Sequence, residues 1–168
     1  EKGDKGDPGP QGPPGPMGNP GSTQGQQIVE VVGTGQLQVT TATNFSLVPG
    51  LTTTVSIPAN AKVLVETSGG VQCSQAGTAY SVVDVALFVD NTISNAGGQR
   101  RVVAANTAGL GQTIANWSFS RALALPAGNH VFEVRAAGVV DSGSVAANVS
   151  SGSAPQIQGT LTVTVLLL

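Results

Sequence analysis

The sequence predicts an all-β protein: an antiparallel β-sandwich head, assembled as a homotrimer and preceded by a triple-helical segment. After residue 27, short apolar stretches recur at spacings of about 8–12 residues with Gly and Pro turns between them, as in sandwiches and barrels. No stretch carries a sustained 3.6-residue apolar period with helix caps. Before that point, glycine occupies every third position, a spacing that requires three chains around one axis.

The glycine repeat runs through residues 1–21. Its glycines are Gly3, Gly6, Gly9, Gly12, Gly15, Gly18 and Gly21. Three polyproline-II-like chains wind around one axis only if the residue at the axis lacks a Cβ, and prolines between the glycines pre-set the backbone φ. The repeat resembles collagen, so we expect a collagen triple-helix stalk with these glycines at its axis. Gln24 breaks the phase, which predicts a linker over 22–27 and a head domain over 28–168.

Composition limits the classes of function. The chain has 40% hydrophobic but only 4% aromatic residues, so Val, Leu, Ile and Ala must fill the core. Charged residues make up 10%, against about 25% in an average protein, and the net charge is −2. So little basic charge predicts no nucleic-acid partner. No stretch approaches the roughly 20 apolar residues that a membrane span needs, and a surface this poor in charge favours an oligomer.

The first half of the head contains short strand patterns separated by turn residues. We expect strands at residues 28–32, 36–41, 45–48, 52–57 and 62–67. Pro49-Gly50 and Pro58-Ala59-Asn60 are predicted turns, because Pro and Gly favour turn backbone conformations. Ser68-Gly69-Gly70 is predicted to end the strand before it.

The second half carries stronger patterns. Residues 80–89 stop at Asp90-Asn91 and alternate, with one apolar face made by Val83, Val85, Leu87 and Val89. Further strands are expected at residues 100–105, 114–125, 130–136, 145–150 and 160–168, with a hairpin turn at 126–128. In the last of these strands, residues 166–168 are apolar on both faces. One face of a sandwich strand meets the core, so we expect the other to meet a neighbouring chain.

The order of a glycine-repeat rod and a compact all-β head resembles the collagen-like surface proteins of bacteria and phages. It also resembles the complement globular-head and tumour-necrosis-factor-like superfamily. Residues 128–134, Gly-Asn-His-Val-Phe-Glu-Val, are similar to the Gly-x-Tyr-x-Phe strand of the complement heads, with His130 in place of tyrosine. This resemblance implies a ten-stranded jelly roll that forms a tight trimer, with the C-terminal strand near the threefold axis.

The sequence offers few residues for catalysis. His130 is the single histidine, and no catalytic motif surrounds Cys73, the single cysteine. We interpret His130 as a packed or hydrogen-bonded structural residue and Cys73 as a small buried hydrophobe, so we predict no enzyme. We expect no cofactor. The alternative is calcium held by Asp84, Asp90 and Asp141 at loop ends or on the trimer axis.

Two charges lie in apolar strand patterns. Asp84 is opposite the apolar face of its strand, and Arg121 shares the parity of Trp117 and Phe119. Either each is exposed at a strand end, or Asp84 and Arg121 pair in the trimer interface, where a buried pair fixes register more than it stabilises.

These patterns together predict a structural and interaction protein exposed on a cell, spore or virion surface. Its head would trimerise the chains, nucleate the triple helix and display three copies of one surface at the end of a stalk. The alternative is an adhesin or tail-fibre tip that binds a cell-surface glycan or protein through loops 94–99, 106–112 and 141–144.

Overall fold

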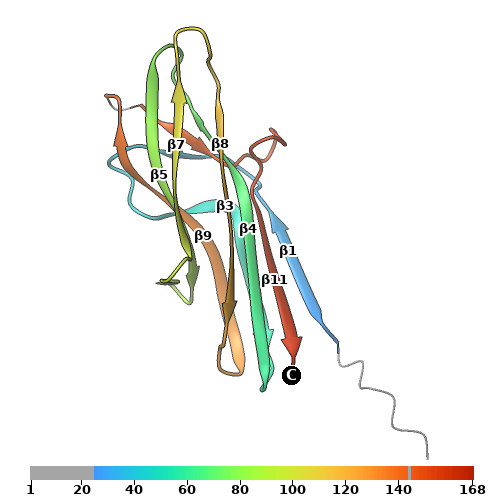
Figure 1. The fold of residues 1–168 in the computed structure, drawn as a ribbon. Coiled ribbons are helices and arrows are strands. Elements are labelled where there is room, and N and C mark those ends of the chain that lie inside the picture. The colour runs from blue at the N-terminus through green and yellow to red at the C-terminus, as the bar shows by residue number, and fades with distance from the viewer. Residues whose placement is uncertain (1–24, 144) are drawn as a thin grey trace, which may run out of the picture.

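The computed structural model describes residues 25–143 and 145–168, so the predicted stalk (1–21) and most of the linker lie outside the described residues. Within those two ranges the chain forms eleven β-strands and no helix (Figure 1). The strands are β1 (Gln27–Val32), β2 (Leu37–Val39), β3 (Ser46–Ile57), β4 (Ala61–Cys73), β5 (Ala79–Val89), β6 (Thr92–Ile93), β7 (Gln99–Asn106), β8 (Ile114–Leu123), β9 (Gly128–Asp141), β10 (Ala147–Val149) and β11 (Thr160–Leu167). The predicted all-β class is confirmed.

The strands pair into two antiparallel sheets. Sheet A has the order β1-β11-β4-β8, and the short strands β10 and β2 continue it beyond the end of β11. Sheet B has the order β3-β9-β5-β7, and β6 pairs with the end of β5. The two sheets pack face to face around one apolar core, which confirms the predicted β-sandwich.

The connectivity is that of a jelly roll. The first strand β1 lies beside the last strand β11, and most long connections cross from one sheet to the other. Double-sheet jelly rolls have eight main strands, and the eight longer strands here follow that plan. The remaining strands, β2, β6 and β10, are only two or three residues long.

The core follows the predicted two-residue period. Val83, Val85 and Leu87 on β5 are fully buried and face sheet A, as their alternation indicated. Trp117 on β8 and Phe132 on β9 are the largest fully buried side chains. Because few aromatic residues are present, valine fills most of the remaining volume between the sheets.

The predicted turn at Pro49-Gly50 is wrong: both residues lie inside the single strand β3. The register of β3 against β9 shifts between Leu47 and Thr52, so the two residues form a bulge in a continuous strand. Gly50 has φ +86, and a Cβ there would lie 2.5 Å from the Thr34 backbone nitrogen. Glycine allows this close approach, in which Thr34 donates its N–H to the Pro49 carbonyl at 3.0 Å.

The predicted break at Ser68-Gly69-Gly70 is also wrong, because β4 runs through it to Cys73. A Cβ at Gly69 would lie 2.2 Å from the Trp117 ring. The glycine therefore makes room for the largest buried side chain while the ladder to β8 continues. A glycine in a strand marks close packing here, not a turn.

The two ends of the sandwich differ in what they contain. The start of β1 and the C-terminus lie together at one end, beside the turn between β3 and β4 (Figure 1). The loop between β7 and β8 lies at the opposite end. β1 therefore begins at the end away from this loop.

Candidate functional site

The outer face of sheet A is built from small and polar side chains. Three rows cross its strands in register: Ile28, Thr164, Leu64 and Ala122; Glu30, Thr162, Glu66 and Ser120; and Val32, Thr160, Ser68 and Ser118. These residues alternate along each strand with core residues such as Val65 and Val163, so they point away from sheet B. Ile28 and Val32 on this face are 61% and 43% exposed. The face is mostly uncharged and partly apolar.

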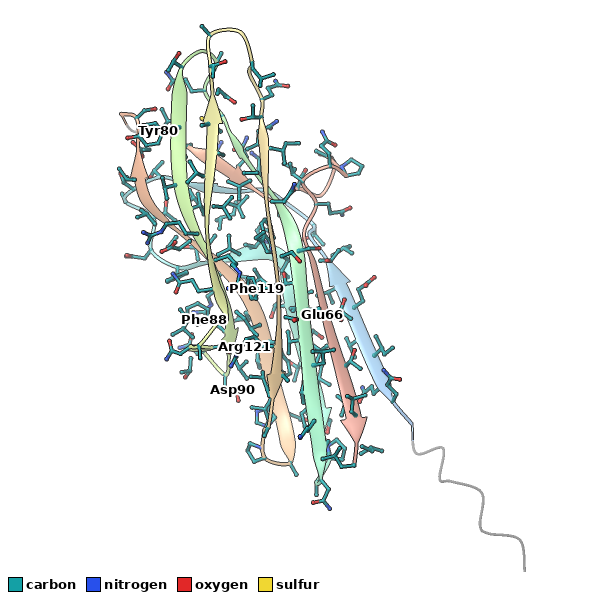
Figure 2. The ribbon with its side chains drawn as sticks, in the orientation of Figure 1. Glu66, Tyr80, Phe88, Asp90, Phe119 and Arg121 are labelled. Carbon is teal, nitrogen blue, oxygen red and sulfur yellow. The ribbon has the colours of Figure 1, made fainter. Side chains whose placement is uncertain are left out.

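Near its centre the face has a hollow of about 290 Å³. It is lined by Glu66, Thr67, Ser68, Ser118, Phe119, Ser120, Thr160 and Thr162. Figure 2 shows Glu66 on the outer side of β4. Among the described residues, no side chain or backbone group forms a hydrogen bond or ion pair with the Glu66 carboxylate. The hollow thus combines one unpaired carboxylate with several hydroxyl groups.

The outer face of sheet B pairs its charges within the chain. Asp84 on β5 accepts two hydrogen bonds from Arg101 on β7, both at 2.8 Å. The two residues are register partners, and the ion pair raises the pKa of Arg101. Arg135 likewise bonds to Glu133 at 2.5 Å and covers the Phe88 ring at 4.5 Å from its centre.

Asp84 and Arg121, the predicted interface pair, are not brought together within the chain. Asp84 is 8% exposed in the middle of β5, so its placement as an exposed strand-end residue is wrong. Its carboxylate is already occupied by Arg101. Arg121 lies in the other sheet, on β8, and donates to the Ala96 carbonyl at 2.5 Å. A contact between Asp84 and Arg121 of different subunits stays a prediction.

Two arginines lie at one edge of the sandwich, where β7 is the last strand of sheet B and β8 is the last strand of sheet A. Arg100 donates to the carbonyls of Gly97 and Gln99, and its guanidinium lies 5.6 Å from the centre of the Phe119 ring. The Nε of Arg121 is buried and has no hydrogen-bond partner in the described part of the chain. Neither guanidinium has a carboxylate partner within residues 25–143 and 145–168.

His130 is a hydrogen-bonded structural residue, as the sequence predicted. Its Nδ1 lies 2.6 Å from the Asp90 carboxylate and its Nε2 lies 2.9 Å from the Pro126 carbonyl. Both partners only accept, so the protonated ring, which donates from both nitrogens, fits best. The hydrogen bond to Asp90 raises the pKa of His130. The Val131 backbone N–H and then His130 lower the pKa of Asp90.

The residues named for calcium occupy different surroundings. Asp84 is paired with Arg101, Asp90 with His130, and Asp141 accepts from the Thr41 backbone N–H at 3.3 Å. No group of three or more His, Cys, Asp and Glu side chains that could hold a metal occurs in the part of the chain described. Cys73 is buried, as expected for a small hydrophobe.

The predicted recognition loops lie at different ends of the head. The Ser142 backbone N–H donates to the Tyr80 carbonyl, and the Tyr80 backbone N–H donates to the Ser142 hydroxyl. Residues 141–143 therefore lie beside the start of β5, at the end that also carries loop 106–112 (Figures 1 and 2). Exposed apolar side chains also gather there: Tyr80 at 40%, Val103 at 55%, Leu110 at 61% and Val140 at 45%. Loop 94–99 instead lies beside Arg121, and residue 144 is outside the described residues.

Sequence reasoning missed Glu66 and Arg100. A single glutamate on an alternating strand has no neighbouring motif, and its isolation depends on the pairing of four strands. Whether a charged side chain has an opposite partner depends on the strand register, which the sequence alone does not give.

No helix in the described residues is long and apolar enough to cross a membrane.

The fold and these surfaces define a jelly-roll β-sandwich with one sparsely charged face. No protein-family model matches the chain, and no curated protein matches its sequence. Solved structures to which it is similar include those of the infectious bursal disease virus Gt strain (12% identity, 93% of this chain, 43% of that chain, TM-score 0.37) and Gx strain (13%, 92%, 42%, 0.37). A third is the VP2 subviral particle of the same virus (14%, 93%, 43%, 0.37). The chain spans less than half the length of these proteins.

Proposed function

We propose that this chain is a structural and interaction protein whose C-terminal head trimerises, nucleates the triple helix of the stalk and displays three copies of one surface. The seven axial glycines, Gly3 to Gly21, have a function only when three chains are joined. The head supplies the association, and the stalk holds it away from an anchor. The protein is exposed on a cell, spore or virion surface.

The sparsely charged outer face of sheet A supports this proposal most directly. It carries exposed Ile28, Val32 and Leu166 between threonine, serine and alanine, and small side chains allow a second sheet or edge to approach closely. Exposed apolar area in a flat patch is typical of an interaction surface. In this arrangement Leu166, the apolar residue on the outer side of β11, meets a neighbouring chain.

The short distance along the chain between the glycine repeat and β1 supports a position of β1 near the axis of the proposed stalk. Gln27 begins β1 six residues after Gly21, and six residues span at most about 20 Å. Three copies of β1 must therefore start close to one axis. Because β1 is the edge strand beside β11, this edge of sheet A lies within reach of that axis in the proposed trimer.

The order of assembly follows from entropy. Joining three chains costs about 4–15 kcal/mol of translational and rotational freedom for each association. Seven Gly-X-Y triplets offset little of this cost, since each triplet adds only a small stabilising free energy. A trimeric head holds the three stalk strands at a local concentration in the millimolar range, from which the triple helix grows.

The proposal is tested by melting the stalk with and without its head. Circular dichroism should show a cooperative polyproline-II-like transition for the full chain. A peptide of residues 1–24 at the same chain concentration should show none. Equal transitions in the two samples would mean that the head contributes nothing to stalk assembly.

A receptor-binding tip is the second candidate. Tyr80, Val103 and Val140 form an exposed apolar patch on sheet B, near loops 106–112 and 141–143. This end lies opposite the start of β1, where a stalk would leave the head (Figure 1). Binding of the full chain to a glycan array or to cells, lost in Tyr80→Ala, would favour a tip. No binding at high concentration would favour a passive filament.

A further inference from the structure

A ring of three identical chains requires two different surfaces on each chain, because the contact in a threefold ring is heterologous. One surface of each subunit meets the second surface of the next. The following inference rests on the proposed trimer and concerns which two surfaces meet.

The first surface carries unneutralised negative charge. Glu30 and Glu66 occupy one row across sheet A, on either side of Thr162. Glu30 accepts one hydrogen bond, from Thr162 at 3.2 Å, and Glu66 accepts none within the residues described. The remaining charge on this face, Lys62, is four residues from Glu66 along β4, about 13 Å away. The centre of the face is therefore acidic.

The second surface carries unneutralised positive charge. Arg100 and Arg121 lie at the edge formed by β7 and β8, which pair on only one side in the described sheets. Both guanidiniums bond to carbonyl groups of residues 96–99, and Arg100 also contacts the Phe119 ring. Carbonyls leave the positive charges unneutralised, so this edge is basic.

The other acidic side chains that lie close to a basic one in the described head form ion pairs with it. Asp84 has Arg101, Glu133 has Arg135 and Asp90 has His130. Among the described residues, the acids Glu30 and Glu66 thus lie unpaired near the centre of the sheet A face, with Lys62 at its end, and the arginines without a carboxylate partner lie at the β7–β8 edge.

We infer that a second copy of this chain docks its β7–β8 edge onto the outer face of sheet A, with Arg100 over the Glu66 hollow. A guanidinium has five N–H donors in a planar fork. Two can meet the Glu66 carboxylate, and the hydroxyls of Ser68, Ser118, Ser120, Thr160 and Thr162 line the hollow as further acceptors. The 290 Å³ volume admits one such group.

The charge pair sets which surfaces meet and in which register, while the surrounding apolar and small side chains supply most of the burial. Opposite charges on neighbouring subunits also speed correct encounter and disfavour a face-to-face dimer, in which Glu66 would meet Glu66. The ring is then the arrangement in which both surfaces are neutralised.

The test uses charge reversal in the full chain and sedimentation equilibrium over a range of concentrations. Glu66→Arg should raise the trimer dissociation constant by about 10-fold or more, because like charges then face each other. The double variant Glu66→Arg/Arg100→Glu should restore most of the loss. Thr54→Arg, a positive charge on exposed β3 in sheet B, is the control and should change little.

Different results would contradict the proposed trimer and the proposed contact between its two surfaces. A wild-type chain that stays monomeric removes the trimer itself. A wild-type trimer whose dissociation is unchanged by Glu66→Arg overturns the inference alone and leaves the hollow for another ligand.

A second variant covers the case in which charge reversal prevents folding. Glu66→Cys/Arg100→Cys, treated as the assembled protein with a short bifunctional maleimide because an Arg–Glu pair spans more than a disulfide does, should give covalent dimers and trimers on a denaturing gel. Glu66→Cys alone and Arg100→Cys alone, each with the buried Cys73 as its other thiol, should stay monomeric there. Only monomers from the double variant would show that the two surfaces do not meet.

Discussion

The indole N–H of Trp117 donates to the hydroxyl of Thr67 at 3.2 Å, across the pairing of β8 with β4. Thr67 in turn donates to the Thr160 carbonyl on β11 at 2.7 Å. Both side chains are almost fully buried. A short polar chain therefore joins three neighbouring strands of sheet A beneath the face that we assign to assembly.

Replacing Thr67 by valine should destabilise the head by about 1–3 kcal/mol, because the buried Trp117 N–H loses its acceptor. Thr67→Ser keeps the hydroxyl and should recover most of the loss. Denaturant unfolding followed by Trp117 fluorescence measures both. Equal stability of the valine variant and the wild type would mean that the indole N–H finds another partner.

Gly69→Ala should destabilise the head by at least about 1–3 kcal/mol, since its Cβ would overlap the Trp117 ring at 2.2 Å. Gly109→Ala is a matched control, because a Cβ there has nothing within 4 Å. Thermal unfolding of the two variants compares them. A small loss at Gly69, similar to that at Gly109, would contradict the packing that explains why β4 continues through its glycines.

The His130–Asp90 pair predicts a pH dependence of stability. The pKa of His130 is raised in the folded state, so its contribution is fully present below its usual pKa of about 6.5 and is lost as the pH rises through the raised value. The pKa of Asp90 is lowered, so its contribution is lost as the pH falls below its usual range toward the lowered value.

The melting temperature of the head should therefore fall when the pH is raised from about 6 to about 9, if His130 is the group that titrates. His130→Gln should have a flatter profile over the same interval. Differential scanning calorimetry at matched ionic strength measures both profiles. The same slope in wild type and variant would assign the effect to another group.

The axial glycines give a prediction for the stalk. Gly12→Ala should lower the melting temperature of the triple helix, because an axial Cβ has no space between three chains. The neighbouring Gln11→Ala, away from the axis, should have a much smaller effect. The unfolding of the head should be the same in both variants. Circular dichroism during heating separates the two transitions.

Much of the fold could be predicted from local patterns. Val83, Val85 and Leu87 alternate along β5, and this period placed them in the core correctly. The sequence predicts breaks at Gly50 and Gly69, because glycine is common in turns. The structure uses them for close contacts with Thr34 and Trp117, which are distant in sequence. Contacts of that kind depend on the tertiary fold and leave no local signal.

The candidate site was predicted less well, for a related reason. Asp84 and Arg121 looked unusual within their own strands, but the partner of Asp84 is decided by the register that places Arg101 opposite it. Glu66 looked like an ordinary solvated residue, and its isolation is visible only once sheet A is assembled. Its relation to Arg100 also depends on a surface that another chain must supply.

The central claim is that three chains associate through their heads. Sedimentation equilibrium of the chain with and without residues 1–21 tests this most directly. The chain mass is 16.7 kDa, so the account predicts about 50 kDa for the full chain and a trimer of the shortened chain as well. A full chain that sediments at 16.7 kDa would contradict it.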